Sequence, residues 1–431
     1  QGVATLDVVT MHTGGASAHG LYASYDTGGR QPLFEADGVD VTTTGAGSIG
    51  AVARLGGTVH LRDSTLLTTG AKGYGVLSGG PGELTLRDTH VRTQGLEAYA
   101  GVVNANGRLD IDGGSLISER HAALWVRTAR EVAARNGAQL IGGNGTLMDV
   151  DAAFSSPFEL HLDQDVYAQG DIAITPEDIA AGVPVLADIR VRLNGRSHWV
   201  GATTAVNQVA LSDNSRWTLT GDASVGQLNL QDSTLALSAA GSTSFNRLTV
   251  SGDVEANNAL LIFNGALGDD TSLIDFLHVR GDTRGSAGIQ VNNVHGLGAQ
   301  TSNGIQLIQV DGRSDAAYTL NGRAVAGSYD YFLHKGGVTT PGDGGWYLRS
   351  ALTPTPPDPC DLDPTGPGCV TVPPPDPCDL DPTGPGCVIV PPPEPCDLDP
   401  TGPGCVIVPT PEPCEADPTG PGCVIVPPPE P

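Results

Sequence analysis

A 25-residue repeat constrains the fold of this 431-residue chain more than any other feature. The segment Gly57-Thr58-Val59-His60-Leu61 returns 25 residues later as Gly82 to Leu86, and again as Gly107 to Ile111. Other positions recur with the same spacing: Leu66, Val91 and Leu116; Gly45, Gly70 and Gly95; and Tyr74 and Tyr99. Because so short a unit cannot bury its own apolar face, successive units must stack on one another.

Within each repeat, apolar and polar residues alternate over three to five positions, and Gly, Asp, Asn or Ser interrupts the runs. This is the period of short strands, and no sustained helical period accompanies it. The pattern predicts an all-β fold, a parallel β-helix whose coils lie about 4.8 Å apart. Aromatic residues make up only 5% of the chain, which suits a narrow aliphatic core.

Two stretches fit this pattern less well. Residues 122–142 can be drawn as an amphipathic helix, but Asn136-Gly137 and the return of Gln139-Leu140-Ile141 favour another coil with a longer strand. The segment Thr175 to Val185 has a Thr-x-x-Asp capping pattern with Pro176 after the Thr. It predicts one helical turn or a loop that projects from the stack.

The formal charge of −26 repels phosphate backbones, so nucleic-acid binding is excluded. The sequence contains no run of 18 or more apolar residues, so no membrane-spanning helix is predicted. The amino terminus, Gln1-Gly2-Val3, has no basic and apolar leader. We therefore expect either a processed chain or a fragment.

From about residue 197 the sequence resembles the carboxy-terminal part of a pertactin-type autotransporter passenger. The resemblance spans some 150 residues and rests on the order and spacing of several segments: Ser197 to Ala202, Ser215 to Gly221, Ser224 to Leu230, Gly268 to Asp275, Leu277 to Gly285, Gly304 to Val310, Gly327 to Tyr331 and Trp346 to Leu348. It implies a right-handed β-helix over 1–196, closed by a cap over 197–350 that serves as folding nucleus, or autochaperone. Trp199, Trp217 and Trp346 are expected in the core of that cap.

In the family a membrane β-barrel follows the passenger, whereas this chain stops at Pro431 without one. The resemblance thus implies contact with a membrane only through a missing carboxy-terminal barrel. We expect that the barrel is omitted here or that another export route is used.

Residues 351–431 form an extended, Pro-rich tail with 13 acidic and no basic side chains, and residues 358–431 repeat every 18 positions. Each repeat contains one Cys-x8-Cys pair; the eight cysteines are Cys360, Cys369, Cys378, Cys387, Cys396, Cys405, Cys414 and Cys423. Four local disulfide rings have the lowest chain-entropy cost, although other pairings are possible. Zinc is disfavoured because the tail has neither Cys-x2-Cys spacing nor histidine.

The sequence contains no protease, esterase or zinc-hydrolase motif, and no metal or cofactor site is predicted. The carboxylate pairs Asp110 with Asp112 and Asp269 with Asp270 could serve a glycosidase, but solvated turns explain them better. Two carboxylates in each tail repeat, such as Asp361 with Asp363, fall short of the ligands that calcium requires.

The tripeptide Arg280-Gly281-Asp282 is typical of integrin ligands. It lies within the Leu277 to Gly285 segment of the resemblance, where a Gly-Asp turn is expected whatever residue precedes it. A structural turn is therefore the favoured interpretation, and receptor binding stays open as the alternative.

These observations favour a non-enzymatic, surface-displayed or secreted adhesin of a Gram-negative bacterium. Its partners would be host-cell or matrix receptors, or other bacterial cells. Expected contact surfaces are the loop Tyr25 to Gln31, the segment Thr175 to Val185, and the solvent faces of the strands. The alternatives are a polysaccharide-degrading β-helix enzyme and a self-associating rod that aggregates bacteria.

Overall fold

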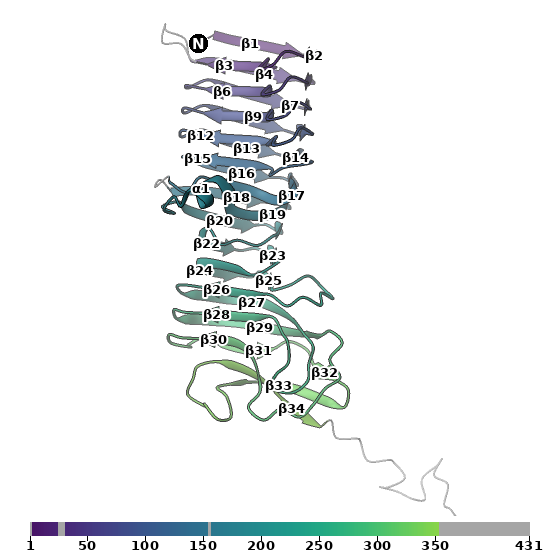
Figure 1. The fold of residues 1–431 in the computed structure, drawn as a ribbon, viewed down its shortest axis with the longest axis vertical. Coiled ribbons are helices and arrows are strands. Elements are labelled where there is room, and N and C mark those ends of the chain that lie inside the picture. Colours follow the sequence, from purple (N-terminus) through teal and green to yellow (C-terminus); the bar gives the residue numbers. More distant parts are fainter. Residues whose placement is uncertain (1, 25–30, 154–156, 353–431) are drawn as a thin grey trace, which may run out of the picture. The chain divides into compact units, whose positions relative to one another are not determined.

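A computed structural model describes residues 2–24, 31–153 and 157–352, and the eight cysteines lie outside these ranges. The chain divides into two units, Gln1–Pro354 and Thr355–Pro431, and all described residues belong to the first. In that unit the strands stack coil upon coil (Figure 1). The predicted parallel β-helix is confirmed.

Strands of successive coils pair in parallel and form three columns. The first column contains β1 (Gly2–Asp7), β4 (Pro32–Asp37), β7 (Thr58–Arg62), β10 (Glu83–Arg87), β13 (Arg108–Asp112), β16 (Glu131–Arg135), β18 (Pro157–Asp163), β20 (Asp188–Asn194), β22 (Val206–Leu211) and β24 (Ala223–Gln231). The second contains β2 (Thr10–Thr13), β5 (Asp40–Thr43), β8 (Thr65–Thr68), β11 (His90–Thr93), β14 (Ser115–Ser118), β17 (Gln139–Val150), β19 (Tyr167–Ile174), β21 (His198–Val200), β23 (Arg216–Thr218) and β25 (Thr234–Ala236).

The third column contains β3 (Leu21–Ser24), β6 (Ile49–Arg54), β9 (Tyr74–Gly79), β12 (Gly101–Asn104) and β15 (Leu124–Arg127), and it continues into β17 and β19. Nearer the carboxy terminus, β24 pairs with both β26 (Arg247–Val250) and β27 (Val254–Gly265). The last parallel strands are β28 (Phe276–Val279), β29 (Thr283–Asn293), β30 (Ile305–Val310) and β31 (Ala317–Leu320).

The 25-residue repeat corresponds to the strand register. Val59, Leu84 and Leu109 are paired across β7, β10 and β13, and all three are buried. Because side chains alternate between faces, a slip of one residue would turn these residues outward. The inward-facing apolar residues of each strand therefore fix the register of the next coil.

Close approach at the coil corners explains the recurring glycines. An added Cβ on Gly70 would lie 1.9 Å from the carbonyl oxygen of Gly45, and one on Gly95 would lie 2.0 Å from that of Gly70. Beside these glycines, the buried hydroxyl of Thr43 donates to that of Thr68 over 2.9 Å. Only a residue without a side chain leaves room for the next coil at this corner.

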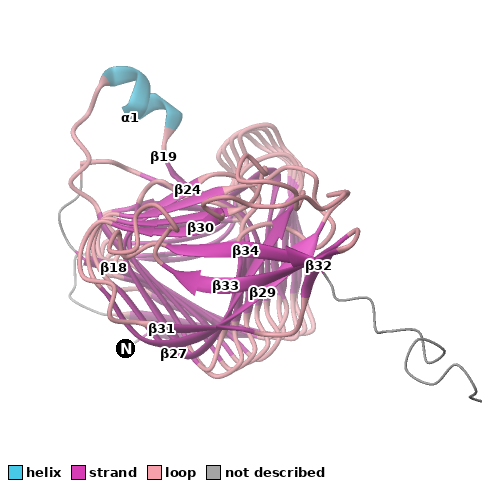
Figure 2. Cartoon of the chain, turned by 90° about the horizontal axis from the view of Figure 1, so that it is seen from below, coloured by secondary structure: helices cyan, strands magenta, loops and turns pink. Residues whose placement is uncertain are grey.

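The irregular segments follow the sequence pattern. Residues 122–142 form β15, β16 and the start of β17, so the coil interpretation is correct. The segment Thr175 to Val185 projects from the stack and contains the single described helix, α1 (Pro176–Ala181) (Figure 2). The Thr175 hydroxyl caps α1 by accepting from the Asp178 N–H. With six residues, α1 is far too short to cross a membrane, and no other described helix exists.

Antiparallel strands close the carboxy-terminal end. β33 (Tyr329–Lys335) pairs with β32 (Ala324–Ala326) and with β34 (Trp346–Leu352), and β34 pairs back onto β30. This arrangement covers a strand edge that would otherwise be free to pair with another chain.

The tryptophans that were expected in the cap core are buried. The rings of Trp199 and Trp217 stack in parallel planes with centroids 4.8 Å apart, and both are fully buried. Their indole N–H groups donate to the carbonyl oxygens of Gly170 and Gly201, each over 2.9 Å. Trp346 on β34 is 8% exposed. Each indole N–H of the stacked pair is thereby satisfied inside the core.

We predict that Gly70→Ala lowers the free energy of unfolding by about 2–3 kcal/mol, because the new methyl group collides with the Gly45 carbonyl. Urea unfolding of the full chain, followed by circular dichroism, measures the loss. Gly221→Ala is the matched control, since a Cβ at Gly221 has no atom within 4 Å. Equal stability of the two variants would contradict the corner-packing argument.

Candidate binding groove on the first column of strands

The outward faces of the first column present polar side chains in rows. On β18, Phe158, Leu160 and Leu162 point inward and are buried, whereas Glu159 and His161 lie between them on the solvent side. The strand register aligns such residues between coils, because β18 pairs with β16 on one side and with β20 on the other. Each outward row therefore runs along the stack.

A groove of about 570 Å³ crosses β16 to β27 on this outward face. Two small outward residues, Ala133 and Ala210, leave it hollow, since their neighbours in register are the larger His161, Arg192 and Asn229. The polar side chains in and beside the groove form two groups of different chemistry, which we call the charged half and the amide patch. Of the charged half, His161 and Arg192 line the groove.

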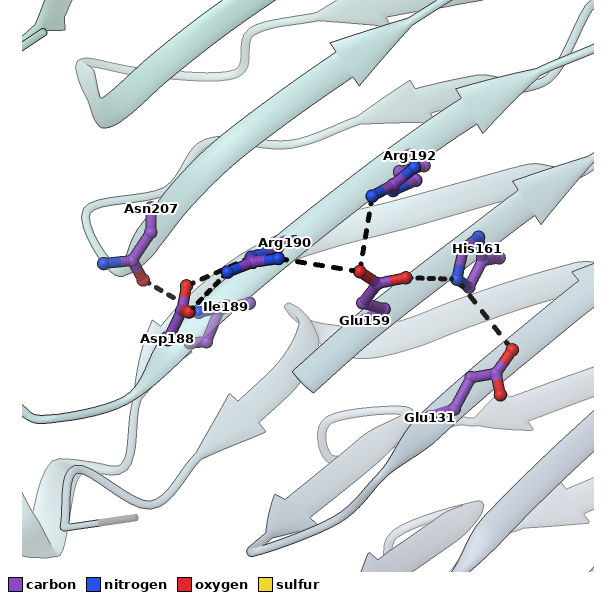
Figure 3. Close-up of polar contacts among 8 residues, drawn as sticks. All are labelled: Glu131, Glu159, His161, Asp188, Ile189, Arg190, Arg192 and Asn207. Carbon is purple, nitrogen blue, oxygen red and sulfur yellow. Dashed lines mark hydrogen bonds and ion pairs between the residues drawn. The ribbon is translucent and has the colours of Figure 1, made fainter. Parts of the chain in front are cut away.

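The charged half contains Glu131, Glu159, His161, Asp188, Arg190 and Arg192, and its members contact one another (Figure 3). The Glu159 carboxylate lies 2.9 Å from His161 Nε2, 3.3 Å from an Arg192 guanidinium nitrogen and 3.9 Å from one of Arg190. Arg190 also pairs with Asp188 over 2.9 Å. Each charge in this half is therefore already met by an opposite charge or by His161.

The amide patch contains Gln208, Gln227, Asn229, Gln231, Glu255 and Asn257, from β22, β24 and β27. Four of these residues line the groove, and the other two flank it two positions earlier on β22 and β24. None of the six side chains makes a hydrogen bond or ion pair with any residue that the structure describes. Their donors and acceptors are therefore available to a ligand.

The rows align within the patch. Gln208 pairs in register with Gln227, Ala210 with Asn229, and Asn229 with Glu255. Two residues further along β24 and β27, Gln231 is paired in register with Asn257. The polar groups thus repeat at the strand spacing along the stack axis.

Carboxyl groups with a raised pKa mark candidate acid catalysts, and in the described residues they lie outside the groove. Burial raises the pKa of Asp149, which accepts from the Tyr99 hydroxyl over 2.9 Å. Burial likewise raises the pKa of Asp275, which accepts from the Ser238 hydroxyl. Among described residues no group of three or more His, Cys, Asp or Glu could hold a metal ion.

The Arg280-Gly281-Asp282 tripeptide is built into the stack. The Asp282 carboxylate accepts from the Arg313 backbone N–H over 2.9 Å and from its guanidinium over 2.7 Å. These bonds hold the pKa of Asp282 below its usual range. Gly281 has no room for a side chain, since an added Cβ would lie 2.4 Å from Asp253 Oδ1. Of the three residues, only Arg280 is classed as exposed, which favours the structural interpretation.

The predicted carboxylate pairs have structural partners. Asp110 and Asp112 both pair with Arg135, over 2.6 and 3.4 Å. Asp269 accepts from the Thr271 backbone N–H and hydroxyl. Neither pair is left free for acid and base catalysis.

Asp270 connects the loop between β27 and β28 to the loop between β29 and β30. Its carboxylate accepts from the backbone N–H groups of Ser302, Asn303 and Gly304, over 2.9, 2.8 and 2.9 Å. Burial disfavours the charged form, but these three N–H groups hold the pKa of Asp270 below its usual range.

Of the other expected contact surfaces, residues 25–30 of the Tyr25 to Gln31 loop lie outside the described residues. The α1 segment exposes Ile179 and Val185 to solvent.

The groove itself was not predicted from the sequence. Its signal is the alternation of amides with inward apolar residues in Gln227 to Gln231, together with alanine at the outward positions 133 and 210.

The chain is similar in sequence to a family model and to several bacterial autotransporters. Residues 223–333 match the family model described as Autochaperone Domain Type 1. Over 127 residues the chain is 46% identical to the adhesin BmaC autotransporter of Brucella suis biovar 1, a match that covers 27% of this chain and 4% of that protein. Over 107 residues it is 44% identical to the autotransporter adhesin AIDA-I of Escherichia coli, covering 25% and 8%.

A longer match, 26% identical over 225 residues, is to the autotransporter adhesin/invasin TibA of Escherichia coli O78:H11 and covers 50% of this chain and 22% of that protein. The solved structure of the autotransporter UpaB from E. coli strain CFT073 is 16% identical with a TM-score of 0.44, covering 81% of this chain and 95% of that one. The matched segments span only 4–22% of the length of the three curated relatives, BmaC, AIDA-I and TibA. The matched relatives and the autochaperone model confirm the resemblance to autotransporter passengers.

We predict that Asp270→Asn lowers the free energy of unfolding at pH 7 by about 1–3 kcal/mol, because an amide cannot accept all three N–H groups. The pKa of Asp270 is lower in the folded state than in the unfolded chain, where it has the ordinary value of about 3.9. Its ionised carboxylate therefore contributes fully to the free energy of unfolding at pH values above that value. That contribution disappears as the pH falls through the lower folded-state pKa. Urea unfolding between pH 7 and pH 2 should show the two proteins converging in acid.

Asp213→Asn is the control for this experiment, because Asp213 is exposed and its side chain makes no bond with a described residue. A stability difference between Asp270→Asn and the unsubstituted chain that persists unchanged at low pH would argue against the ionic role of Asp270.

Proposed function

We propose that this chain, which resembles autotransporter passengers and carries an autochaperone domain at residues 223–333, acts as a non-catalytic adhesin. The observation that carries the proposal is the identity of 44–46% with two autotransporter adhesins. It would be exported across the outer membrane of a Gram-negative bacterium and displayed on the surface or secreted. Its partners would be host-cell surfaces, matrix, or other bacteria.

The structure supports binding over catalysis. The groove has unengaged amides and one unengaged carboxylate, Glu255, whereas its other charged side chains are engaged by neighbouring side chains. A glycosidase needs a carboxylic acid with a raised pKa beside the substrate. The described carboxyls of that kind, Asp149 and Asp275, are buried outside the groove.

A long stack suits weak, repeated contacts. Each coil adds one more row of outward side chains at the strand spacing. Contacts that are weak one by one combine through avidity when many copies are displayed on one cell. We therefore expect adhesion by cells to be much stronger than binding by the purified chain.

The test is to display the full chain on a non-adherent laboratory strain and to count bacteria bound to epithelial monolayers and to immobilised matrix. We expect roughly tenfold or more bound bacteria than for the same strain with an empty display system. Settling of the same cells in suspension measures self-association separately. Adhesion equal to that of the empty strain, or sustained breakdown of a polysaccharide by the purified chain, would overturn the proposal.

A further inference from the structure

The side chains of the amide patch have no partner among the described residues, which is also true of Glu35, His60 and Arg62 near the amino-terminal end of the first column. Next to it, Glu159 connects His161 with Arg190 and Arg192 (Figure 3). Towards the amino terminus, Arg108 pairs with Glu131 and Arg135 with Asp110. In and beside the groove, the polar side chains without a partner lie on β22, β24 and β27, beside the hollow at Ala210.

We propose that the amide patch is a binding site for a neutral polysaccharide that lies along the stack axis. This inference rests on the proposed adhesive function and names the ligand class of the groove. Two observations carry it: the chemical character of the free groups and their alignment along the stack.

The chemistry matches sugar hydroxyl groups. A carboxamide both donates and accepts hydrogen bonds, as a hydroxyl group does, and the patch presents five carboxamides. The sixth member, the carboxylate of Glu255, is an acceptor for two donors at once. Amides and one acceptor thus complement a polyhydroxylated surface without requiring any charge on the ligand.

Electrostatics excludes polyanions from this site. The patch contains no cation, and the lining guanidinium of the adjoining coil, that of Arg192, is already paired with Glu159. The free Glu255 carboxylate and the net charge of −26 both repel an anionic chain. Neither repulsion acts on a neutral glycan.

The geometry suits an extended polymer. Rows of partners in register, such as Asn229 with Glu255 and Gln231 with Asn257, repeat once per strand, at about 4.8 Å. This spacing is comparable to the repeat of a sugar unit in an extended chain. Ala210 leaves room above the sheet for a ring to approach, and the paired charged half holds the adjoining wall of the groove in place.

No Phe, Tyr or Trp side chain lines the groove, so stacking of such rings on sugar faces contributes nothing there. Affinity would come from hydrogen bonds alone, which are individually weak in water. We therefore expect single sugars to bind too weakly to measure and polymers to bind through several successive rows.

The experiment is affinity electrophoresis of the purified full chain through native gels that contain yeast mannan, soluble starch, xyloglucan or polygalacturonate. At least one of the three neutral polymers should retard the chain, and the anionic polygalacturonate should not. The double variant Asn229→Ala with Gln231→Ala should weaken the retardation roughly tenfold, as the loss of two ordinary hydrogen bonds implies.

Asn321→Ala is the matched control, because Asn321 is an exposed amide without a described partner in the turn between β31 and β32. Thermal melting of all variants checks that the fold is intact. The inference is overturned if no neutral polymer retards the chain, if only polygalacturonate does, or if the double variant is retarded as strongly as the unsubstituted chain.

These failures are distinguishable from failure of the proposed function. If displaying cells adhere and the double variant adheres equally well, adhesion stands and the amide patch is not its site. If cells that display the unsubstituted chain do not adhere, the adhesive function fails whatever the gels show.

Discussion

In-register parallel pairing between coils is the interaction on which the rest of this structure depends. A single coil has short strands and no apolar interior of its own, so its buried residues are buried only by the coils above and below. The pairing of Val59, Leu84 and Leu109 shows how one row of apolar side chains becomes a continuous core. At the corners the same pairing brings Gly45, Gly70 and Gly95 so close that no side chain fits between them.

This constraint leaves function to the outward rows. Inward positions must be apolar and of suitable size, whereas outward positions need only be compatible with water and with their neighbours one coil away. Most outward charges of the first column are paired with a neighbour in the next coil, as Arg135 is with Asp110. Pairing of this kind contributes little to stability at an exposed site, but it leaves those groups unavailable to a ligand. The groups that stay available to a ligand are therefore those in polar, unpaired rows, as in the amide patch.

The sequence predicted the fold well because the repeat length equals the sequence separation of the residues that pair between neighbouring coils. The spacing of 25 residues aligns Leu66, Val91 and Leu116, and these three residues are paired across β8, β11 and β14. Alternation also separated strand from helix in residues 122–142, where the choice was between two plausible patterns. The Thr175 cap was readable because a hydroxyl three residues before an acidic residue, followed by proline, has a local mechanism.

The groove could not be predicted in the same way. Between residues 122 and 231 the coil length is no longer constant, so the sequence does not reveal which outward residues become neighbours. His161 beside Ala133, or Asn229 beside Ala210, is a consequence of register that only the folded coils define. The expected boundaries at residues 196 and 350, and the pairing of the eight cysteines, remain predictions.

The family-model match at residues 223–333 includes coils that close the stack, and such coils have a physical reason to be recognisable in sequence. A regular coil accepts many different residues as long as the alternation and the corner glycines are kept. The closing coils depend on particular side chains. Asp275 is buried, and it accepts from the Ser238 hydroxyl and from the backbone N–H groups of Asn246 and Asn264.

Neighbouring amides extend this buried network. The Asn264 amide donates to Ser238 and accepts from Asn292. Such a buried polar network is stable only when every member is satisfied, so a change at one position leaves another group without its partner. A stable end to the stack therefore depends on the identity of residues in this region, whereas the regular coils depend mainly on the pattern. The segment that identifies the chain as passenger-like is accordingly its cap, and the surfaces that meet a ligand can vary independently of it.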